Sequence, residues 1–237
     1  MKSIPYFLLI LTVSFFISPT FSASGSADFT SLQREMVKQQ IIARGIKDLR
    51  VIKAMGKVPR HLFVLEDHRA CAYNDVPLCI GEGQTISQPY IVAFMTETLD
   101  LNAGDKILEI GTGSGYQAAI LAEIVKEVYT IEIIEKLGER AKATLAHLGY
   151  KNIHVKIGDG YKGWPEQAPF DAVIVTCAPE KIPPALVSQL KEGGRMIIPV
   201  GTEGRVQKLI KVTKKNGRTE IQEERYVKFV PMVKCKS

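Results

Sequence analysis

The sequence has few of the residues that bind metal ions. Its 237 residues include four cysteines and four histidines. No two cysteines have the C-x-x-C spacing, and no histidine stands near enough to complete a zinc pattern. We therefore expect no metal centre. The even number of cysteines is compatible with an oxidising compartment, in which a Cys71–Cys79 disulfide bridge is one hypothesis.

Concentrated positive charge is also absent. The formal net charge is only +6, and the basic residues are scattered. The densest basic group surrounds Asn216-Gly217, a dipeptide typical of a tight hairpin turn, and consists of Lys211, Lys214, Lys215 and Arg218. We interpret this group as the solvated tip of a hairpin and expect no nucleic-acid partner. The composition, 46% hydrophobic and 24% charged, excludes disordered, collagenous and coiled-coil chains.

The first 27 residues differ from the rest of the chain. Lys2 precedes a mostly apolar run over residues 4–17, and Pro19 and small residues at 22–27 follow. This order is typical of a secretory signal peptide, and the run is shorter than the roughly 18 residues of a membrane span. We expect residues 1–27 to be a leader cleaved between positions 22 and 27. The remainder, 28–237, is then one exported, periplasmic domain with no membrane span; the alternative is a cytoplasmic protein.

From residue 106 onward, strand and helix patterns alternate. We predict strands at 106–110, 128–131, 153–157, 170–177 and 195–200, and helices at 116–125, 137–148 and 183–190. Strict alternation implies right-handed crossovers and a mostly parallel sheet with helices on both faces. Residues 207–212 and 221–230 predict an antiparallel hairpin at the sheet edge. The fold is therefore expected to be α/β, Rossmann-like and doubly wound.

The part before residue 106 predicts a helical extension. Residues 29–43 and 48–55 have helical spacing, with Thr30 or Ser31 available to cap the first helix. Residues 71–89 contain several glycines and prolines and predict a long loop, which is more often functional than idle. Gly193-Gly194 predicts a turn before the strand at 195–200.

A glycine-rich loop follows the strand at 106–110. There, glycine lets the backbone approach a bound nucleotide closely. The pattern is G-x-G-x-G, one residue short of the dinucleotide fingerprint G-x-G-x-x-G, and tight packing is the alternative explanation for its glycines. The predicted cofactor contacts in this segment are Glu109, Gly111, Thr112, Gly113, Ser114 and Gly115.

Acidic residues follow the next two predicted strands. Glu132 comes at the end of the second strand, where a carboxylate can accept both ribose hydroxyls of a nucleoside. Asp159-Gly160 follows the third strand, where a carboxylate or an amide can reach an adenine edge. Together with the glycine loop, they indicate an adenosyl ligand held without a phosphate grip. S-adenosylmethionine fits this description better than NAD.

At this point the sequence resembles the protein-L-isoaspartate O-methyltransferase family over residues 30–232. The motifs that carry the resemblance are Val58-Pro59-Arg60, Tyr73-x-Asp75-x-Pro77-Leu78, Gly81-x-Gly83-Gln84-Thr85-Ile86-Ser87-Gln88-Pro89, the glycine loop, Gly158-Asp159-Gly160, Gly163-Trp164-Pro165, Ala168-Pro169-Phe170-Asp171-Ala172, Gln189-Leu190-Lys191-x-Gly193-Gly194-Arg195, Pro199-Val200-Gly201 and Phe229-Val230-Pro231. The segment 84–87 is specific to this family, whereas the glycine loop indicates methyltransferases in general. Two departures are Cys177, where the family has alanine, and the leader, since the family is generally cytosolic.

The resemblance implies methyl transfer from S-adenosylmethionine to the free carboxylate of L-isoaspartyl residues in damaged proteins. The ester then collapses to a succinimide, which begins repair. Such a carboxylate, with a reference pKa of about 4, is already an ionised nucleophile and needs no general base. The resemblance places Ser87 at the active site as a hydrogen-bond donor to it, with Thr85 and Ile86 in the wall beside the cofactor. The alternative role of Ser87 is a helix cap before Pro89.

Other functions remain open at this stage. The chain could be an inactive adenosyl-binding protein, or a methyltransferase that acts on another carboxylate or small molecule. Amine methylation is disfavoured because residues 176–179 read Thr-Cys-Ala-Pro instead of Asn or Asp followed by Pro-Pro and an aromatic residue. We expect isoaspartyl proteins and peptides as partners and a monomeric enzyme. Arg60 could pair with the substrate carboxylate or hold the amino-terminal segment.

Overall fold

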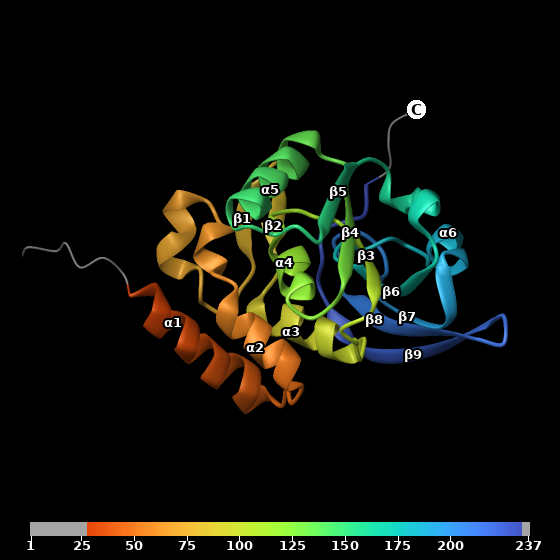
Figure 1. Ribbon diagram of the computed structural model, residues 1–237, viewed down its shortest axis with the longest axis horizontal. Coiled ribbons are helices and arrows are strands. Elements are labelled where there is room, and N and C mark those ends of the chain that lie inside the picture. The colour runs from red at the N-terminus through yellow and green to blue at the C-terminus, as the bar shows by residue number, and fades with distance from the viewer. Residues whose placement is uncertain (1–27, 234–237) are drawn as a thin grey trace, which may run out of the picture.

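A seven-stranded sheet organises the chain (Figure 1). The computed structural model describes residues 28–233, so the proposed leader lies outside the described residues. In spatial order the strands are β5 (Ile153–Ile157), β4 (Glu127–Glu132), β3 (Lys106–Ile110), β6 (Phe170–Val175), β7 (Leu190–Val200), β8 (Gln207–Lys215) and β9 (Arg218–Val227). The first five are parallel, and β8 and β9 are antiparallel. The predicted α/β fold and its edge hairpin are confirmed.

The two faces of the sheet carry separate hydrophobic clusters, because successive strand residues point to opposite faces. Ile107 of β3 joins the first cluster and Leu108 joins the second. The first face is covered by α2 (Leu49–Lys57), α3 (Pro89–Thr98), α4 (Tyr116–Ala122) and α5 (Glu135–His147). The second is covered by α6 (Pro184–Ser188), by the 3₁₀ segment Gly160–Lys162, and by Trp164 and Ala168 on either side of the 3₁₀ segment Pro165–Gln167. Strands buried on both faces explain the nearly continuous apolar runs in the sequence.

The amino-terminal helix runs without a break through three helical geometries. It consists of α1 (Phe29–Glu35), the π-helical segment Met36–Ile41 and the 3₁₀ segment Ile42–Arg44. Its cap is Asp28, whose carboxylate accepts hydrogen bonds from the backbone N–H groups of Thr30 and Ser31, both at 3.1 Å. The predicted caps were wrong because these residues already lie in the first turn and act as donors.

The stretch predicted as a loop at residues 71–89 contains a small hairpin. β1 (Leu78–Gly81) pairs with β2 (Gln84–Ile86), and the turn between them has positive φ at Glu82 and Gly83. α3 then begins at Pro89, a favourable first helical residue. The loop prediction was therefore wrong in part: the two strands are too short, at four and three residues, to leave a pattern.

Two further expectations need correction. Gly193-Gly194 is not a turn before a strand but lies within β7, where the pairing with β6 changes register and Gly193 has a φ of 76°. Cys71 and Cys79 are exposed free thiols, so the bridge between them is not formed. By contrast, the Asn216-Gly217 turn is confirmed, and its basic surroundings serve the fold, since Lys214 donates to the Leu190 carbonyl at 2.8 Å.

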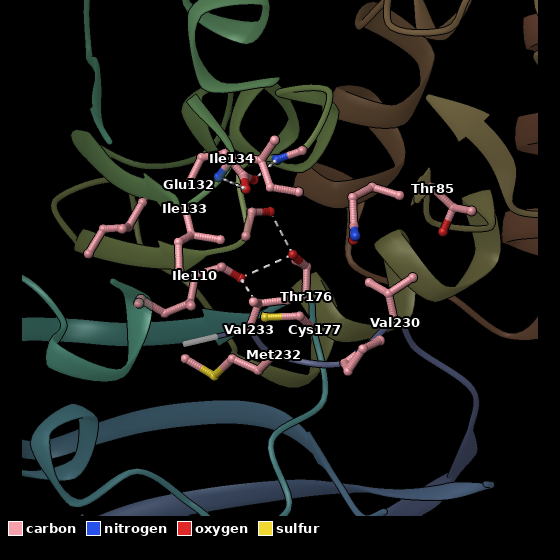
Figure 2. A pocket seen from close by; sticks show the side chains of 16 residues that line it. Thr85, Ile110, Glu132, Ile133, Ile134, Thr176, Cys177, Val230, Met232 and Val233 are labelled. Carbon is pink, nitrogen blue, oxygen red and sulfur yellow. Dashed lines mark hydrogen bonds between the residues drawn. The ribbon is translucent and has the colours of Figure 1, made fainter. Parts of the chain in front are cut away.

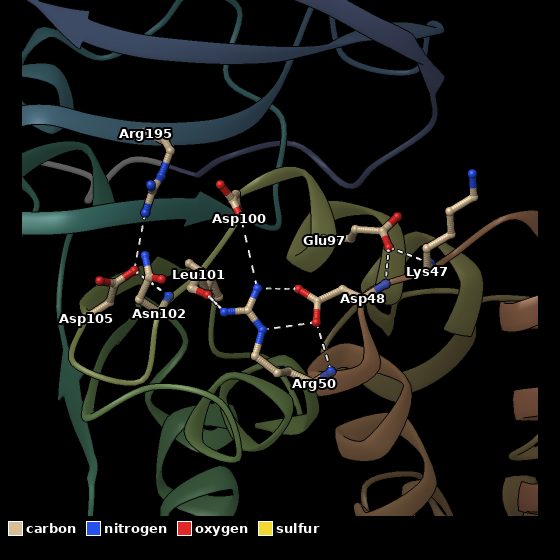
Figure 3. Close-up of polar contacts among 9 residues, drawn as sticks. All are labelled: Lys47, Asp48, Arg50, Glu97, Asp100, Leu101, Asn102, Asp105 and Arg195. Atoms are coloured by element: carbon tan, nitrogen blue, oxygen red, sulfur yellow. Dashed lines mark hydrogen bonds and ion pairs between the residues drawn. The ribbon is translucent and has the colours of Figure 1, made fainter.

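A polar network ties the helices to the amino edge of the sheet (Figure 3). Asp48 caps α2, and the Arg50 guanidinium beside it holds the pKa of that carboxyl below its ordinary value. Arg50 also donates to the Leu101 carbonyl. Asp105 accepts from the Asn102 N–H at 2.9 Å and pairs with Arg195 of β7 at 3.2 Å. This network lies at the start of β3 and leaves the opposite edge of the sheet to the loops.

Within residues 28–233, no helix has the length and hydropathy that a membrane crossing requires. The same part of the chain contains no cluster of three or more His, Cys, Asp or Glu side chains that could hold a metal ion.

Candidate active site

The carboxyl ends of the parallel strands open onto one cavity (Figure 2). Gly111 and Gly113 follow β3, Glu132 ends β4, and Thr176 follows β6. Thr85 reaches the cavity from the opposite side, from the β1–β2 hairpin. Residues far apart in the sequence thus meet because parallel strands end at the same edge of the sheet.

Two glycines in the wall of this cavity have no room for a side chain. A Cβ atom on Gly111, whose φ is 94°, would lie 2.6 Å from the Thr176 hydroxyl oxygen. A Cβ atom on Gly160 would lie 2.4 Å from the Ile110 side chain. Gly115 has another reason to be glycine, because a Cβ there would press on Ala141 and Leu145 of α5 at 3.3 Å. Tight packing therefore explains Gly111 and Gly115 of the glycine loop, and close approach of a nucleotide to this loop stays a prediction.

Glu132 connects the glycine loop to β4. Its carboxylate accepts hydrogen bonds from the backbone N–H groups of Gly113 at 2.8 Å and Ile134 at 3.0 Å. The residue is 6% exposed, so these bonds hold it in one orientation. A carboxylate has about four acceptor positions, which leaves capacity for hydroxyl groups of a ligand.

Glu109 lies behind the glycine loop, on the face of the sheet that α2, α3, α4 and α5 cover. It is fully buried, and neither carboxylate oxygen has a hydrogen-bond partner among residues 28–233. Burial raises its pKa to about 8, and the nearby charge of Glu132 acts in the same direction. Glu109 does not line the cavity, so contact with a cofactor stays a prediction.

The remaining predicted cofactor residues divide into two groups. Thr85, Gly111, Gly113, Glu132 and Gly160 line the cavity. The others do not: Ile86 is buried in the core, Thr112 shares a hydrogen bond with Thr130, Ser114 accepts from the Tyr116 N–H, Gly115 packs on α5, and the Asp159 carboxylate caps a 3₁₀ turn through the Tyr161 N–H. Asp159 is thus engaged locally, while its neighbour Gly160 reaches the cavity.

A third part of the cavity wall was not predicted from the sequence. Thr176 donates to the Gly111 carbonyl at 2.7 Å, and Cys177 follows it. Burial raises the pKa of the Cys177 thiol, with Glu132 and Glu109 adding to the effect. Thr176 and Cys177 stand at the end of the strand predicted at 170–177, and this position could have indicated that they line the site. The chain at 230–233 returns from β9 and pairs with Ala178. Val230 and Pro231 belong to a motif of the family resemblance, but that motif gave them no role in the site. The other lining residues that were missed are Gln84, Ile110, Ile131, Ile133 and Ile134.

A second, larger cavity adjoins the first. The two share Thr85, Thr176 and Val230. Apart from these, the second cavity is lined by Pro77, Ser87, Gln88, Ile91, Val206, Tyr226, Val227, Lys228 and Phe229. Among the described residues, its lining includes one cation, Lys228, and no carboxylate. The cavity is therefore suited to an extended, partly apolar ligand that carries negative charge.

Ser87 lies in this second cavity, directly before α3. The cap position of α3 is Gln88, so the helix-cap role of Ser87 is wrong. The Ser87 hydroxyl makes no hydrogen bond within residues 28–233, which leaves it able to donate to a ligand, while its carbonyl accepts from Arg60 at 2.7 Å. Arg60 is 0% exposed and cannot reach a substrate, which excludes one of its two interpretations.

Comparison with known proteins finds a protein family whose model matches most of the chain. The family model described as Protein-L-isoaspartate(D-aspartate) O-methyltransferase (PCMT) matches residues 31–237. A protein-L-isoaspartate O-methyltransferase of Opitutus terrae is 55% identical over 207 residues, covering 87% of this chain and 89% of the relative. Its namesake in a Synechococcus species is 52% identical over 214 residues, covering 88% of each chain.

Two solved structures are also similar. One, a protein-L-isoaspartate O-methyltransferase, has a TM-score of 0.78 at 30% identity and covers 84% of this chain and 65% of its own. The other, from Plasmodium falciparum, is described under the same activity in complex with S-adenosyl-L-homocysteine. It has a TM-score of 0.74 at 27% identity and covers 87% of this chain and 99% of its own.

We expect Glu109→Gln to remove a pH dependence of stability. Glu109 has an ordinary pKa of 4.5 and keeps its proton in the folded state up to a pH of about 8. The folded state thus binds more protons than the unfolded state between these values. The free energy of unfolding of the protein therefore falls as pH rises, and Glu109 contributes at most about 1.4 kcal/mol per pH unit to this fall.

Urea unfolding at pH 5 and pH 8 measures the effect. Glu109→Gln should lose less stability than the wild type over this range, whereas the control Glu135→Gln, at an exposed carboxylate, should match the wild type. Parallel losses in all three proteins would refute the assignment.

Proposed function

The chain belongs to the protein-L-isoaspartate(D-aspartate) O-methyltransferase family, and on this premise we propose that its two joined cavities bring a methyl donor and an isoaspartyl carboxylate together. The reaction is the transfer of a methyl group from S-adenosylmethionine to the free carboxylate of an L-isoaspartyl residue. The observation that carries the proposal is that the cavities share Thr85, Thr176 and Val230. At this junction a donor in one cavity and a peptide in the other come into contact.

The first cavity fits an adenosyl cofactor. Glu132 presents acceptors suited to ribose hydroxyls, and Gly111 and Gly113 bring the backbone to the cavity without a side chain. Among residues 28–233, no Lys or Arg lines this cavity, so it lacks the grip that a pyrophosphate requires. When bound, S-adenosylmethionine supplies an electrophilic methyl group.

The second cavity aligns the carboxylate of the peptide with the methyl donor. An isoaspartyl carboxylate is ionised near neutral pH and attacks without a base. We assign Ser87 the role of donating its O–H to this carboxylate, which fixes the attacking oxygen at the junction. Lys228 gives the cavity a positive charge that favours an anionic peptide. Positioning of two reactants can lower a barrier by roughly 7–11 kcal/mol, so alignment is the main contribution required of the protein.

The decisive assay compares two peptides that differ only in one linkage. We expect the full-length protein to transfer labelled methyl from S-adenosylmethionine to an isoaspartyl peptide and not to its aspartyl twin. The twin has no free carboxylate at the same position, so it is the matched control. Equal transfer to both peptides, or to neither, would overturn the proposed function and favour a different acceptor or an inactive adenosyl-binding protein.

Two substitutions should separate the roles of the cavities. Ser87→Ala is expected to lower kcat by about 10- to 100-fold, the cost of one hydrogen bond to a charged group, and to leave the Kd for S-adenosylhomocysteine within about 3-fold. Glu132→Gln is expected to weaken S-adenosylhomocysteine binding by about 10-fold or more. Calorimetry and initial rates measure both, with Ser188→Ala on α6 as the control. Unchanged turnover in Ser87→Ala would remove its assigned role.

We further propose that residues 1–27 are a removable leader that directs export and that 28–237 form the methyltransferase domain. The support is the order of Lys2, an apolar run, Pro19 and small residues. Cell fractionation should find a shortened chain outside the cytosol, and a variant that lacks residues 2–27 should stay in the cytosol with its activity intact. A full-length chain retained in the cytosol would contradict the proposal.

A further inference from the structure

Arg60 is a fully buried cation beside the active site. It is 0% exposed, and no carboxylate of the described chain forms an ion pair with it. Its Nε donates to the Ala72 carbonyl and its Nη2 to the Ser87 carbonyl, both at 2.7 Å. The guanidinium carbon lies 4.8 Å from the centre of the Tyr116 ring.

This arrangement lowers the stability of the fold. A buried charge without an opposite charge loses hydration that main-chain carbonyls and an aromatic face return only in part. The third nitrogen, Nη1, has no hydrogen-bond partner within residues 28–233. An apolar side chain of similar volume would avoid the cost, so packing alone does not explain an arginine here. Its position is explained by the three segments that it joins.

Those segments meet at the active site. Ser87 lines the second cavity, and Tyr116 is the first residue of α4, directly after the glycine loop. From the other side, Asp75 accepts from the Gln88 side chain at 2.7 Å and the Tyr90 N–H at 3.2 Å. The backbone at Ser87 is thus held on both sides, and Arg60 relates it to the helix that starts at the cofactor loop.

We propose that Arg60 is a positioning residue, which fixes the main chain of Ser87 relative to the cofactor loop and thereby aims the Ser87 hydroxyl. The inference rests on the proposed function, since it acts through Ser87. Arg60 does not touch substrate or cofactor. A lysine cannot replace it, because the planar guanidinium donates in two fixed directions, whereas an ammonium group is a single point on a flexible stem.

Arg60→Lys tests the proposal. We expect kcat to fall by about 10- to 100-fold, as for a small misplacement of a reacting group, with the Kd for S-adenosylhomocysteine within about 3-fold of the wild type. The control is Arg195→Lys, which weakens an arginine pair at the opposite edge of the sheet and should leave kcat unchanged. A normal kcat in Arg60→Lys would overturn the proposal.

A double variant separates positioning from general destabilisation. If Arg60 acts through Ser87, Arg60→Lys should reduce kcat by less than 2-fold in the Ser87→Ala background. Losses that multiply would show that Arg60 acts elsewhere and would contradict the proposal. The wild-type assay distinguishes failure of the proposed function from failure of the role of Arg60. An inactive wild type refutes the proposed function, whereas an active wild type with an equally active Arg60→Lys refutes only the role of Arg60.

Chemical rescue covers the case in which Arg60→Lys does not fold. Arg60→Ala leaves a cavity that a small guanidinium ion can enter. Turnover should then rise saturably with millimolar methylguanidinium and not with methylammonium, which lacks the planar pair of donors. Absence of saturable recovery with methylguanidinium, or equal recovery with both ions, would overturn the proposal.

Discussion

The parallel pairing of β4, β3 and β6 is the constraint on which the site depends. It brings Glu132, Gly111 and Thr176 to one edge of the sheet, although more than twenty residues separate them along the chain. Hydrogen bonds then fix the ends to one another: Glu132 accepts from Gly113, and Thr176 donates to the Gly111 carbonyl. Side chains at the ends of β4 and β6 are therefore hydrogen-bonded to the backbone of the glycine loop that follows β3.

Two buried ionisable groups flank this edge, and each is costly. Within residues 28–233, the Glu109 carboxylate has no hydrogen-bond partner behind the glycine loop, and Arg60 forms no ion pair behind Ser87. A sequence optimised for stability alone would replace both with apolar residues. Their presence beside the two cavities indicates that part of the stability of the fold is given up for the geometry of the site. The ion pairs at the amino edge, such as Asp105–Arg195, lie far from this trade-off.

The sequence predicted those parts of the molecule that depend on local pattern. The bounds of β3 and β5 were predicted residue for residue. Each is a short apolar segment between turns, and in a chain of alternating strands and helices such a segment is predicted as a strand. The β1–β2 hairpin was missed because its strands are too short for periodicity. Asp159 was expected to face a ligand, but whether a carboxylate caps a turn depends on the local backbone. The role of Arg60 could not be decided, since burial is a property of the tertiary structure.

In the proposed reaction, cofactor and substrate meet at the wall shared by the two cavities, and Ser87 donates to the carboxylate. A crystal structure with S-adenosylhomocysteine and an isoaspartyl peptide would show whether they do. We expect the free carboxylate of the peptide within about 3 Å of the Ser87 hydroxyl, beside Thr85 and Thr176, and in line with the sulfur of the cofactor. A carboxylate bound elsewhere, with Ser87 facing solvent, would contradict it.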